Sequence, residues 1–269
     1  MAGAGGGNVA RMPIAIVTGG NSGIGKAICV TLAARGFDIG LTWHADEDNL
    51  AEVEEEIRAA GRRVVSKRMD LDVGVAELEA SCTVVAELCD ALGGVDVFVH
   101  NAGAGLSDAI LDCSFEDWMR IQNIVLGAGF LTGRLVGRRM RDAGTQGRIV
   151  YITSVHEHVP LSGNGAYVAA KHGLGGLVKN LALEVAPLGI TVNAVAPGEI
   201  ATKMTGQEDQ DPSASERTGI PAGRPGDARE IAWMVAALAE PDARYATGQS
   251  YVVDGGMLLM AAEANQLAQ

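Results

Sequence analysis

The chain has 269 residues, of which 48% are hydrophobic and 20% charged, a composition that suits a packed globular domain and excludes global disorder. Its net charge of -12 has the wrong sign for a protein that neutralises nucleic-acid phosphates. No apolar run is long enough to span a membrane, and residues 1–12 lack the hydrophobic stretch of a secretory signal. We therefore expect a flexible segment over 1–12 and one cytoplasmic domain over 13–269, without nucleic-acid or membrane partners.

Short β-branched runs alternate with longer segments of helical periodicity along the chain. Seven runs are predicted as strands: 14–19, 38–43, 64–69, 95–100, 149–154, 190–195 and 249–254. The segments predicted as helices are 23–35, 46–60, 74–92, 115–142, 164–187 and 227–239. This order predicts an α/β class protein, a single-domain doubly wound (Rossmann) fold whose seven-stranded parallel sheet has helices on both faces.

The first predicted strand runs into a glycine-rich turn with the sequence TGGNSGIGK at 18–26. Glycines at this place allow the chain to turn sharply and to present a helix N-terminus to a pyrophosphate. The spacing GxxxGxG is neither the fingerprint GxGxxG nor the phosphate loop GxxxxGK[ST], which disfavours a kinase or an ATPase. Taken alone, the turn is equally consistent with a tight connection.

Three residues near the fifth predicted strand can carry acid-base chemistry. Ser154 ends that strand, and Tyr167 and Lys171 follow with the four-residue spacing that places two side chains on one helix face. A free tyrosine holds its proton until about pH 10, so a nearby ammonium is needed to lower its pKa toward neutrality. A Tyr-Lys pair alone is a weak signal, because any helix can carry it by chance.

Cysteine and histidine residues do not indicate a metal. Cys29, Cys82, Cys89 and Cys113 form no CxxC pair and are predicted to be free thiols. The run 156–158, His-Glu-His, follows Ser154, but its spacing and the lack of a further His or Cys cluster argue against a tetrahedral site. We expect His156 and His158 to shape a polar substrate cavity or to pack under a lid.

The segment 203–226 has no clear periodicity and is rich in Pro, Gly and Ser. A stretch of this length in a compact domain is either a functional lid or disordered. Because it follows a strand end, where ligands bind in such sheets, we favour a substrate lid.

Several motifs in chain order resemble those of a short-chain dehydrogenase/reductase. They are TGGNSGIG after the first strand, HNAG at 100–103, Ser154, YVAAK at 167–171, Pro197-Gly198 and Asp254-Gly255-Gly256. The similarity spans roughly residues 13–256, and the segments TWHADED and ITSVHEH are most similar to bacterial ketoreductase-type members. The resemblance implies hydride transfer between a nicotinamide and a carbonyl carbon.

The resemblance also implies residue roles. Tyr167 would be the proton donor or acceptor, Lys171 would lower its pKa and bind the nicotinamide ribose, and Ser154 would hydrogen-bond the substrate oxygen. The residues implied to bind the cofactor, besides Tyr167 and Lys171, are Thr18, Gly19, Ser22, Gly23, Ile24, Gly25, Trp43, His44, Asp70, Leu71, Asn101, Ala102, Gly103, Pro197, Gly198, Ile200 and Thr202.

One position departs from the family pattern. Members usually carry an Asn seven residues after an aromatic such as Trp118, where it helps kink the helix and hold a water in a proton relay to Lys171. This register gives Val125 here, and the nearest Asn, Asn123, would face elsewhere on the helix. Because a main-chain carbonyl at 125 can still serve, we expect a weakened or rerouted relay.

The end of the second strand bears on the choice of cofactor. An acidic residue there selects NAD, but this chain has Trp43 followed by His44, and Asp46 lies further on. We therefore expect NADP(H) to be favoured over NAD(H), with Ser22, Trp43 and His44 around the phosphate.

The sequence as a whole predicts an NAD(P)-dependent oxidoreductase acting on a ketone or a secondary alcohol. The alternatives are an NAD-dependent sugar or polyol dehydrogenase and a catalytically silent cofactor-sensing protein. The presence of Ser154, Tyr167 and Lys171 argues against a silent protein. By the same resemblance we expect a homotetramer assembled through the helices at 115–142 and 164–187.

Overall fold

A computed structural model of the chain describes residues 11–105, 107–207 and 211–260. Most of the expected flexible segment, residues 1–10, and the end of the predicted domain, residues 261–269, lie outside the described residues. Arg11, the first described residue, is anchored, since its guanidinium lies 2.7 Å from the Asp96 carboxylate.

Seven parallel strands form one sheet in the order β3-β2-β1-β4-β5-β6-β7. They are β1 (Ile14–Val17), β2 (Asp38–Trp43), β3 (Val64–Arg68), β4 (Val97–His100), β5 (Arg148–Ile152), β6 (Thr191–Pro197) and β7 (Ser250–Val253). The predicted fold class is therefore confirmed. The strand order reverses between β1 and β4, and in such sheets ligands bind where the carboxyl ends of these two strands diverge.

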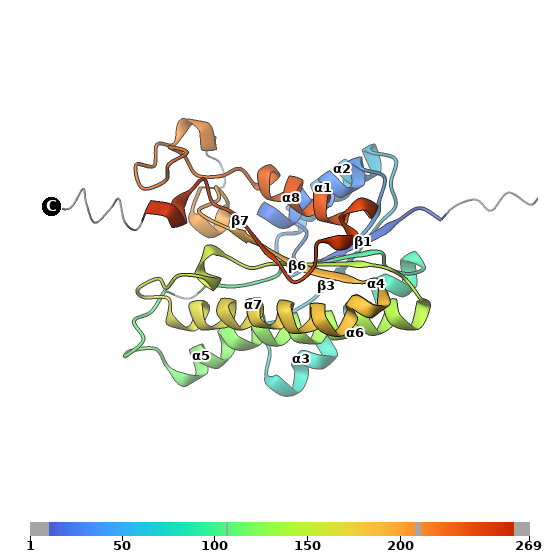
Figure 1. Ribbon diagram of the computed structural model, residues 1–269, viewed down its shortest axis with the longest axis horizontal. Helices are drawn as coiled ribbons and strands as arrows, with labels where there is room; N and C mark the ends of the chain where they lie inside the picture. The colour runs from blue at the N-terminus through green and yellow to red at the C-terminus, as the bar shows by residue number, and fades with distance from the viewer. Residues whose placement is uncertain (1–10, 106, 208–210, 261–269) are drawn as a thin grey trace, which may run out of the picture.

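Helices cover both faces of the sheet (Figure 1). One face carries α1 (Gly23–Ala34), α2 (Glu47–Ala59) and α8 (Ala228–Ala239), which pack on residues such as Val17 and Leu41. The other carries α3 (Val75–Cys82), α4 (Val84–Leu92), α5 (Phe115–Ile121), α6 (Ala128–Ala143) and α7 (Gly165–Val185). Two apolar cores result, one on each side of the sheet, as the largely apolar strands predicted.

Two of the predicted helices are interrupted. The segment 74–92 divides into α3 and α4 at Thr83, whose hydroxyl bonds the Ala80 carbonyl at 2.6 Å and so competes with the helical backbone. The segment 115–142 contains a π-helix over Gln122–Gly127 between α5 and α6. π-helical turns inside α-helices are frequent at functional sites, and the insertion was not predicted from the sequence.

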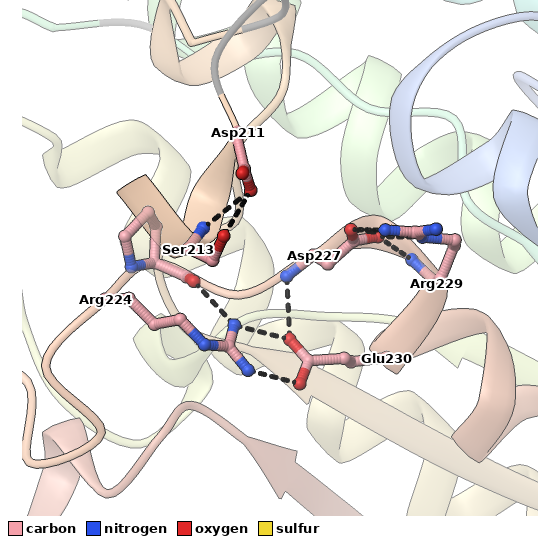
Figure 2. A network of polar contacts seen from close by, with 7 residues as sticks. Asp211, Ser213, Arg224, Asp227, Arg229 and Glu230 are labelled. Carbon is pink, nitrogen blue, oxygen red and sulfur yellow. Dashed lines mark hydrogen bonds and ion pairs between the residues drawn. The ribbon is translucent and has the colours of Figure 1, made fainter. Parts of the chain in front are cut away.

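The expected lid, 203–226, is anchored at its base. Its end pairs with the segment after β6 through the bridge between Ile200 and Gly226. Figure 2 shows the polar network that joins this end to the first turn of α8, where Arg224 holds Glu230 through two bonds of 2.9 and 2.7 Å. Asp227 caps α8 and pairs with Arg229. Two short 3-10 turns, Lys203–Thr205 and Pro212–Ala214, lie within the segment, and residues 208–210 are outside the described part.

All four cysteines are free, as predicted from their spacing. In the part of the chain that the structure describes, no helix is both long and apolar enough to cross a membrane.

Candidate functional site

The glycine-rich turn brings the first crossover close to β4. Gly19 and Gly23 have positive φ angles of 65° and 50°, which favour glycine. A Cβ atom on Gly25 would collide with the Gly19 carbonyl oxygen and would lie 2.6 Å from Nδ2 of Asn101. That amide donates to the carbonyls of Thr18 and Gly19 at 3.1 and 3.0 Å. The turn is therefore a cradle of backbone whose shape depends on the absence of side chains.

The N-terminus of α1 opens into this cradle. Ser22 is the N-cap residue, yet its side chain makes no capping hydrogen bond to the helix. The first backbone N–H groups of an α-helix have no partner within the helix and carry a partial positive charge. The turn thus presents donors to an anion such as a pyrophosphate.

Ser154, Tyr167 and Lys171 lie together at the carboxyl end of β5 and on the first turns of α7. The Lys171 ammonium is 5.5 Å from the centre of the Tyr167 ring and donates to the Ile152 carbonyl at 2.9 Å. The Ser154 hydroxyl is buried and accepts a hydrogen bond from the His156 backbone at 3.2 Å. One hydroxyl, one phenol and one ammonium therefore converge.

Burial governs the proton affinities of this group. It lowers the pKa of Lys171 to about 8, and the Glu157 carboxylate opposes this fall. Burial raises the pKa of Tyr167, and the Ser154 side chain opposes the rise. An ammonium next to a phenol favours the phenolate, and Lys171 lies within reach of Tyr167 on the same helix.

His100 lies behind the catalytic group and is fully buried. Its Nδ1 lies 3.3 Å from the Thr132 hydroxyl and 3.5 Å from that of Thr18, as expected for a scaffold residue. Its Nε2 makes no regular hydrogen bond among the described residues, although the nearby Val125 backbone favours the charged ring and opposes the fall in its pKa. Burial and the positive charge of Lys171 lower the pKa of His100 to about 3, so the ring is neutral at physiological pH.

Val125 lies on the π-helix and is fully buried. The position at which the resemblance implies a kink-forming Asn therefore lies in a change of helix type. In the same turn, the Gln122 amide donates to the Ala166 carbonyl at 2.8 Å and so ties the π-helix to α7. The expectation of a rerouted relay remains a prediction.

A cavity of about 510 Å³ connects the glycine turn to the catalytic group. Of the predicted site residues, only Thr18 is absent from its wall. Thr18 lies behind the wall, where its hydroxyl accepts from the backbones of Asn101 and Ala102 at 3.0 Å each. The predicted residues that line the cavity are Gly19, Ser22, Gly23, Ile24, Gly25, Trp43, His44, Asp70, Leu71, Asn101, Ala102, Gly103, Ser154, Tyr167, Lys171, Pro197, Gly198, Ile200 and Thr202.

The far end of the cavity is polar and carries charges of both signs. Trp43 ends β2, and His44 Nε2 lies 3.3 Å from the Asp70 carboxylate. Asp46 adopts a left-handed backbone with φ of 73°, and its carboxylate lies 3.3 Å from the Lys203 ammonium. This ion pair joins the start of the segment 203–226 to the turn after β2.

The run 156–158 lies differently from the expectation. The His156 ring meets the Tyr167 ring edge-on with 6.3 Å between centres, but His156 and His158 are not among the cavity-lining residues. His158 turns to the start of β7, where its Nε2 lies 3.1 Å from the Ser250 hydroxyl. The expected place of His158 in the wall of the substrate cavity is therefore wrong, because its side chain is held at the start of β7, and its packing under the lid stays a prediction.

No group of three or more His, Cys, Asp or Glu side chains is placed to hold a metal ion within residues 11–105, 107–207 and 211–260.

Sequence reasoning missed several residues of the cavity. Asn21 donates to the Ala45 carbonyl at 2.7 Å and fixes the turn after β2. Lys203 and Met204 bring the lid to the cavity wall. For Asn21 the signal was its place inside the glycine turn, whereas the contact of Lys203 with Asp46 joins residues 157 positions apart and has no local signal.

The cavity fits a dinucleotide on structural grounds. Its volume is that of a ligand pocket, and it extends from a helix N-terminus that presents backbone donors to a buried acid-base group. The glycines of the cradle leave room that a Cβ atom would fill.

Comparisons with known proteins agree with this geometry. The sequence profile of the family described as enoyl-(acyl carrier protein) reductase matches residues 19–258. The chain is 44% identical over 246 residues to the uncharacterized oxidoreductase YohF of Escherichia coli K12, covering 91% of this chain and 96% of the relative. It is 38% identical over 247 residues to the 3-oxoacyl-[acyl-carrier-protein] reductase FabG of the same organism, covering 92% and 98%.

Two crystal structures show the same architecture. The acetoin dehydrogenase YohF from Salmonella typhimurium has a TM-score of 0.85 at 44% identity, covering 92% of this chain and 96% of that one. The acetoin dehydrogenase from Enterobacter cloacae has a TM-score of 0.85 at 45% identity, covering 93% and 97%.

Proposed function

Because this chain belongs to the short-chain dehydrogenase/reductase family, whose members are NAD(P)-dependent oxidoreductases of carbonyl and alcohol groups, we propose that it interconverts a small neutral ketone and its alcohol with Ser154, Tyr167 and Lys171 as the catalytic group. The observation that carries the proposal is the convergence of these three side chains at one end of a dinucleotide-sized cavity. When bound, the nicotinamide supplies or accepts the hydride.

The protein's own part is to move one proton and to hold the substrate oxygen. In reduction, the Tyr167 hydroxyl donates its proton to the developing alkoxide, and the Ser154 hydroxyl donates a hydrogen bond to the same oxygen. The Lys171 ammonium stabilises the phenolate that remains, from the 5.5 Å separation seen in the structure. Proton transfer by a positioned side chain contributes roughly 10²- to 10⁴-fold to a rate.

The wall beside the catalytic group favours an uncharged substrate. Besides Ser154, Tyr167 and Lys171, the cavity wall includes Ala104, Gly198 and Met204. None of these three carries a charge that would select a carboxylate or a phosphate. Together with the titles of the two solved relatives, this supports a short hydroxyketone or vicinal diketone such as acetoin or diacetyl as the substrate class.

For the cofactor we propose a preference for NADPH over NADH. β2 ends in Trp43 and not in a carboxylate, and the Lys203 ammonium lies beside the turn that follows. Lys203 is held by Asp46 across 3.3 Å and is 65% exposed, so it can turn to a 2′-phosphate at small cost.

A carbonyl screen with NADPH oxidation as the readout tests the substrate and the cofactor together. Diacetyl and acetoin should be reduced, and a simple acyl thioester of a 3-oxo acid should be a poorer substrate. Faster turnover of the thioester would favour the activity named for FabG. Titration of the protein with NADH and NADPH should show tighter binding of NADPH, and a clear preference for NADH would overturn the cofactor proposal.

We further propose a cytoplasmic homotetramer. The cytoplasm holds the nicotinamide dinucleotides that the enzyme needs. The helices α6 and α7 lie side by side on one face and expose the apolar residues Phe130 and Leu183, which are 46% and 78% exposed in the isolated chain. Light scattering coupled to size exclusion should give four times the mass of the 27.8 kDa chain, and a monomer would contradict this assembly.

A further inference from the structure

Glu157 is a buried acid that the proposed reaction does not use. Its side chain is 2% exposed, and Oε1 lies 3.3 Å from His158 Nε2. Oε2 has no hydrogen-bond partner among the described residues. A buried carboxylate without adequate partners is costly, so such a group needs a compensating charge close by.

Besides His158, the position of Glu157 relative to α7 identifies Lys171 as a second group that can supply this charge. A Cβ atom on Gly175 would lie 3.0 Å from Oε1 of Glu157, so the carboxylate packs against the helix at this point. Gly175 follows Lys171 by four residues and therefore lies on the same helix face, one turn away. The glycine leaves room for the carboxylate against α7, one helical turn from Lys171.

We propose that Glu157 is a positioning residue that keeps Lys171 protonated by placing a carboxylate one helical turn away in a site from which water is excluded. The inference rests on the proposed function, in which Lys171 acts on Tyr167. The proposal gives a role to the short turn that begins at Ser154. Ser154 itself supplies the substrate-binding hydroxyl, and Glu157 in the turn supplies the acid that supports the lysine.

The other groups that face Lys171 do not provide this support. His100 from β4 is neutral, because its own pKa is lowered to about 3. Tyr167 on α7 is uncharged while it holds its proton, and the Ile152 carbonyl is a dipole. Against the lowering of the Lys171 pKa by burial, Glu157 is the group that raises it.

The charge of Lys171 can be followed directly. The chain has five lysines, so lysine labelled with ¹³C at Cε gives few signals, and Lys171→Met assigns the relevant one. In Glu157→Gln, the midpoint of the Lys171 titration should fall by about one pH unit or more, the size expected for the loss of a nearby opposite charge. In Glu157→Asp the midpoint of the Lys171 titration should lie between those of the natural protein and Glu157→Gln. If Glu157→Gln does not fold, a midpoint in Glu157→Asp below that of the natural protein tests the proposal instead.

The matched control is Glu184→Gln. Glu184 lies on the same helix but is exposed and bonds Asn180, so this substitution should leave the Lys171 midpoint unchanged. An unchanged midpoint in Glu157→Gln, or an equal fall in both variants, would refute the proposal.

A second measurement links the charge to catalysis. In alcohol oxidation Tyr167 must lose its proton, and a neutral Lys171 makes this harder. The acidic limb of the pH profile of kcat/KM should therefore move to higher pH in Glu157→Gln. In Glu157→Asp it should move part of the way back. An acidic limb that stays in place in Glu157→Gln would contradict the positioning role of Glu157. The titration of Lys171 needs neither substrate nor cofactor. If the natural enzyme shows no turnover, the proposed function is refuted, but the titration still decides whether Glu157 supports the charge of Lys171.

Discussion

The two walls of the cleft are held in different ways. The catalytic wall, made by the end of β5 and the start of α7, places Ser154 and Lys171 at 7% and 5% exposure. The lid wall is held by ion pairs between partly exposed side chains, Lys203 with Asp46 and Arg224 with Glu230. Exposed ion pairs contribute little and weaken with salt, whereas buried contacts are rigid. We infer that the reacting groups are fixed in place and that access to them is adjustable.

The largest effect should come from the catalytic wall. Tyr167→Phe removes the proton donor but keeps the ring, so diacetyl reduction should fall by about 10²- to 10⁴-fold while the NADPH dissociation constant changes little. Steady-state kinetics and a fluorescence titration measure the two quantities. Tyr251→Phe, on β7 and away from the cavity wall, is the control. Turnover that survives in Tyr167→Phe would remove the mechanism.

The burial of the His100 ring should make the free energy of unfolding depend on pH. The pKa of His100 is about 3 in the folded chain and near 6.5 when unfolded, so below about pH 6.5 the unfolded state binds the extra proton and the free energy of unfolding falls. Between pH 7 and pH 5 this residue should remove about 2 kcal/mol. Urea unfolding at both values should show a smaller fall in His100→Asn, and equal falls in both proteins would show that the ring is not held neutral.

A substitution in the π-helix should have a smaller effect on activity than Tyr167→Phe. Val125→Asn restores the usual family residue, and the activity should stay within an order of magnitude of the natural enzyme because a backbone carbonyl can serve in the relay. Stability should fall by about 1–3 kcal/mol, since the site is apolar and fully buried. Asn123→Val, on the same π-helix, is the control for a change of helix propensity. A gain in kcat well above tenfold would show that the natural relay is impaired.

The smallest effect is expected at the lid wall. Lys203→Gln breaks the ion pair with Asp46 and removes the ammonium that we propose turns to the 2′-phosphate; because these groups are exposed to solvent, NADPH dissociation should change only about twofold. Stopped-flow release at low and high salt measures this. Lys67→Gln, which removes an exposed pair with Glu87 away from the cavity, should have no effect on release. A change of tenfold or more would mean that the lid wall is as rigid as the catalytic one.

Local patterns were sufficient for the fold. The alternation of β-branched runs and helical periodicity predicted all seven strands. The bounds of most of them differ by one or two residues, as in β1, which ends at Val17, and in β6, which ends at Pro197. The breaks at Thr83 and at Gln122–Gly127 were missed, because a side-chain bond to the backbone and a change of helix type leave the apolar spacing intact.

The residues of the candidate site also fall into two groups, those that local motifs predicted and those whose place depends on tertiary contacts. Gly19, Gly25, Tyr167 and Lys171 belong to short motifs whose geometry depends on neighbours in sequence, and the motifs taken together indicated a phosphate cradle and a Tyr-Lys pair on one helix face. By contrast, His158 was expected to shape the substrate cavity or to pack under the lid, but it does not line the cavity, and its Nε2 lies 3.1 Å from the Ser250 hydroxyl on β7.

What the sequence by itself determined is the order of the elements and the residue types of the reaction centre, since hydrophobic periodicity and turn chemistry act over a few residues. Only the tertiary structure decided that Glu157 packs one turn below Lys171 and that Lys203 meets Asp46, because these contacts depend on how the chain folds back over the sheet. Electrostatic effects follow distance and burial in space, and these are set only when the elements pack.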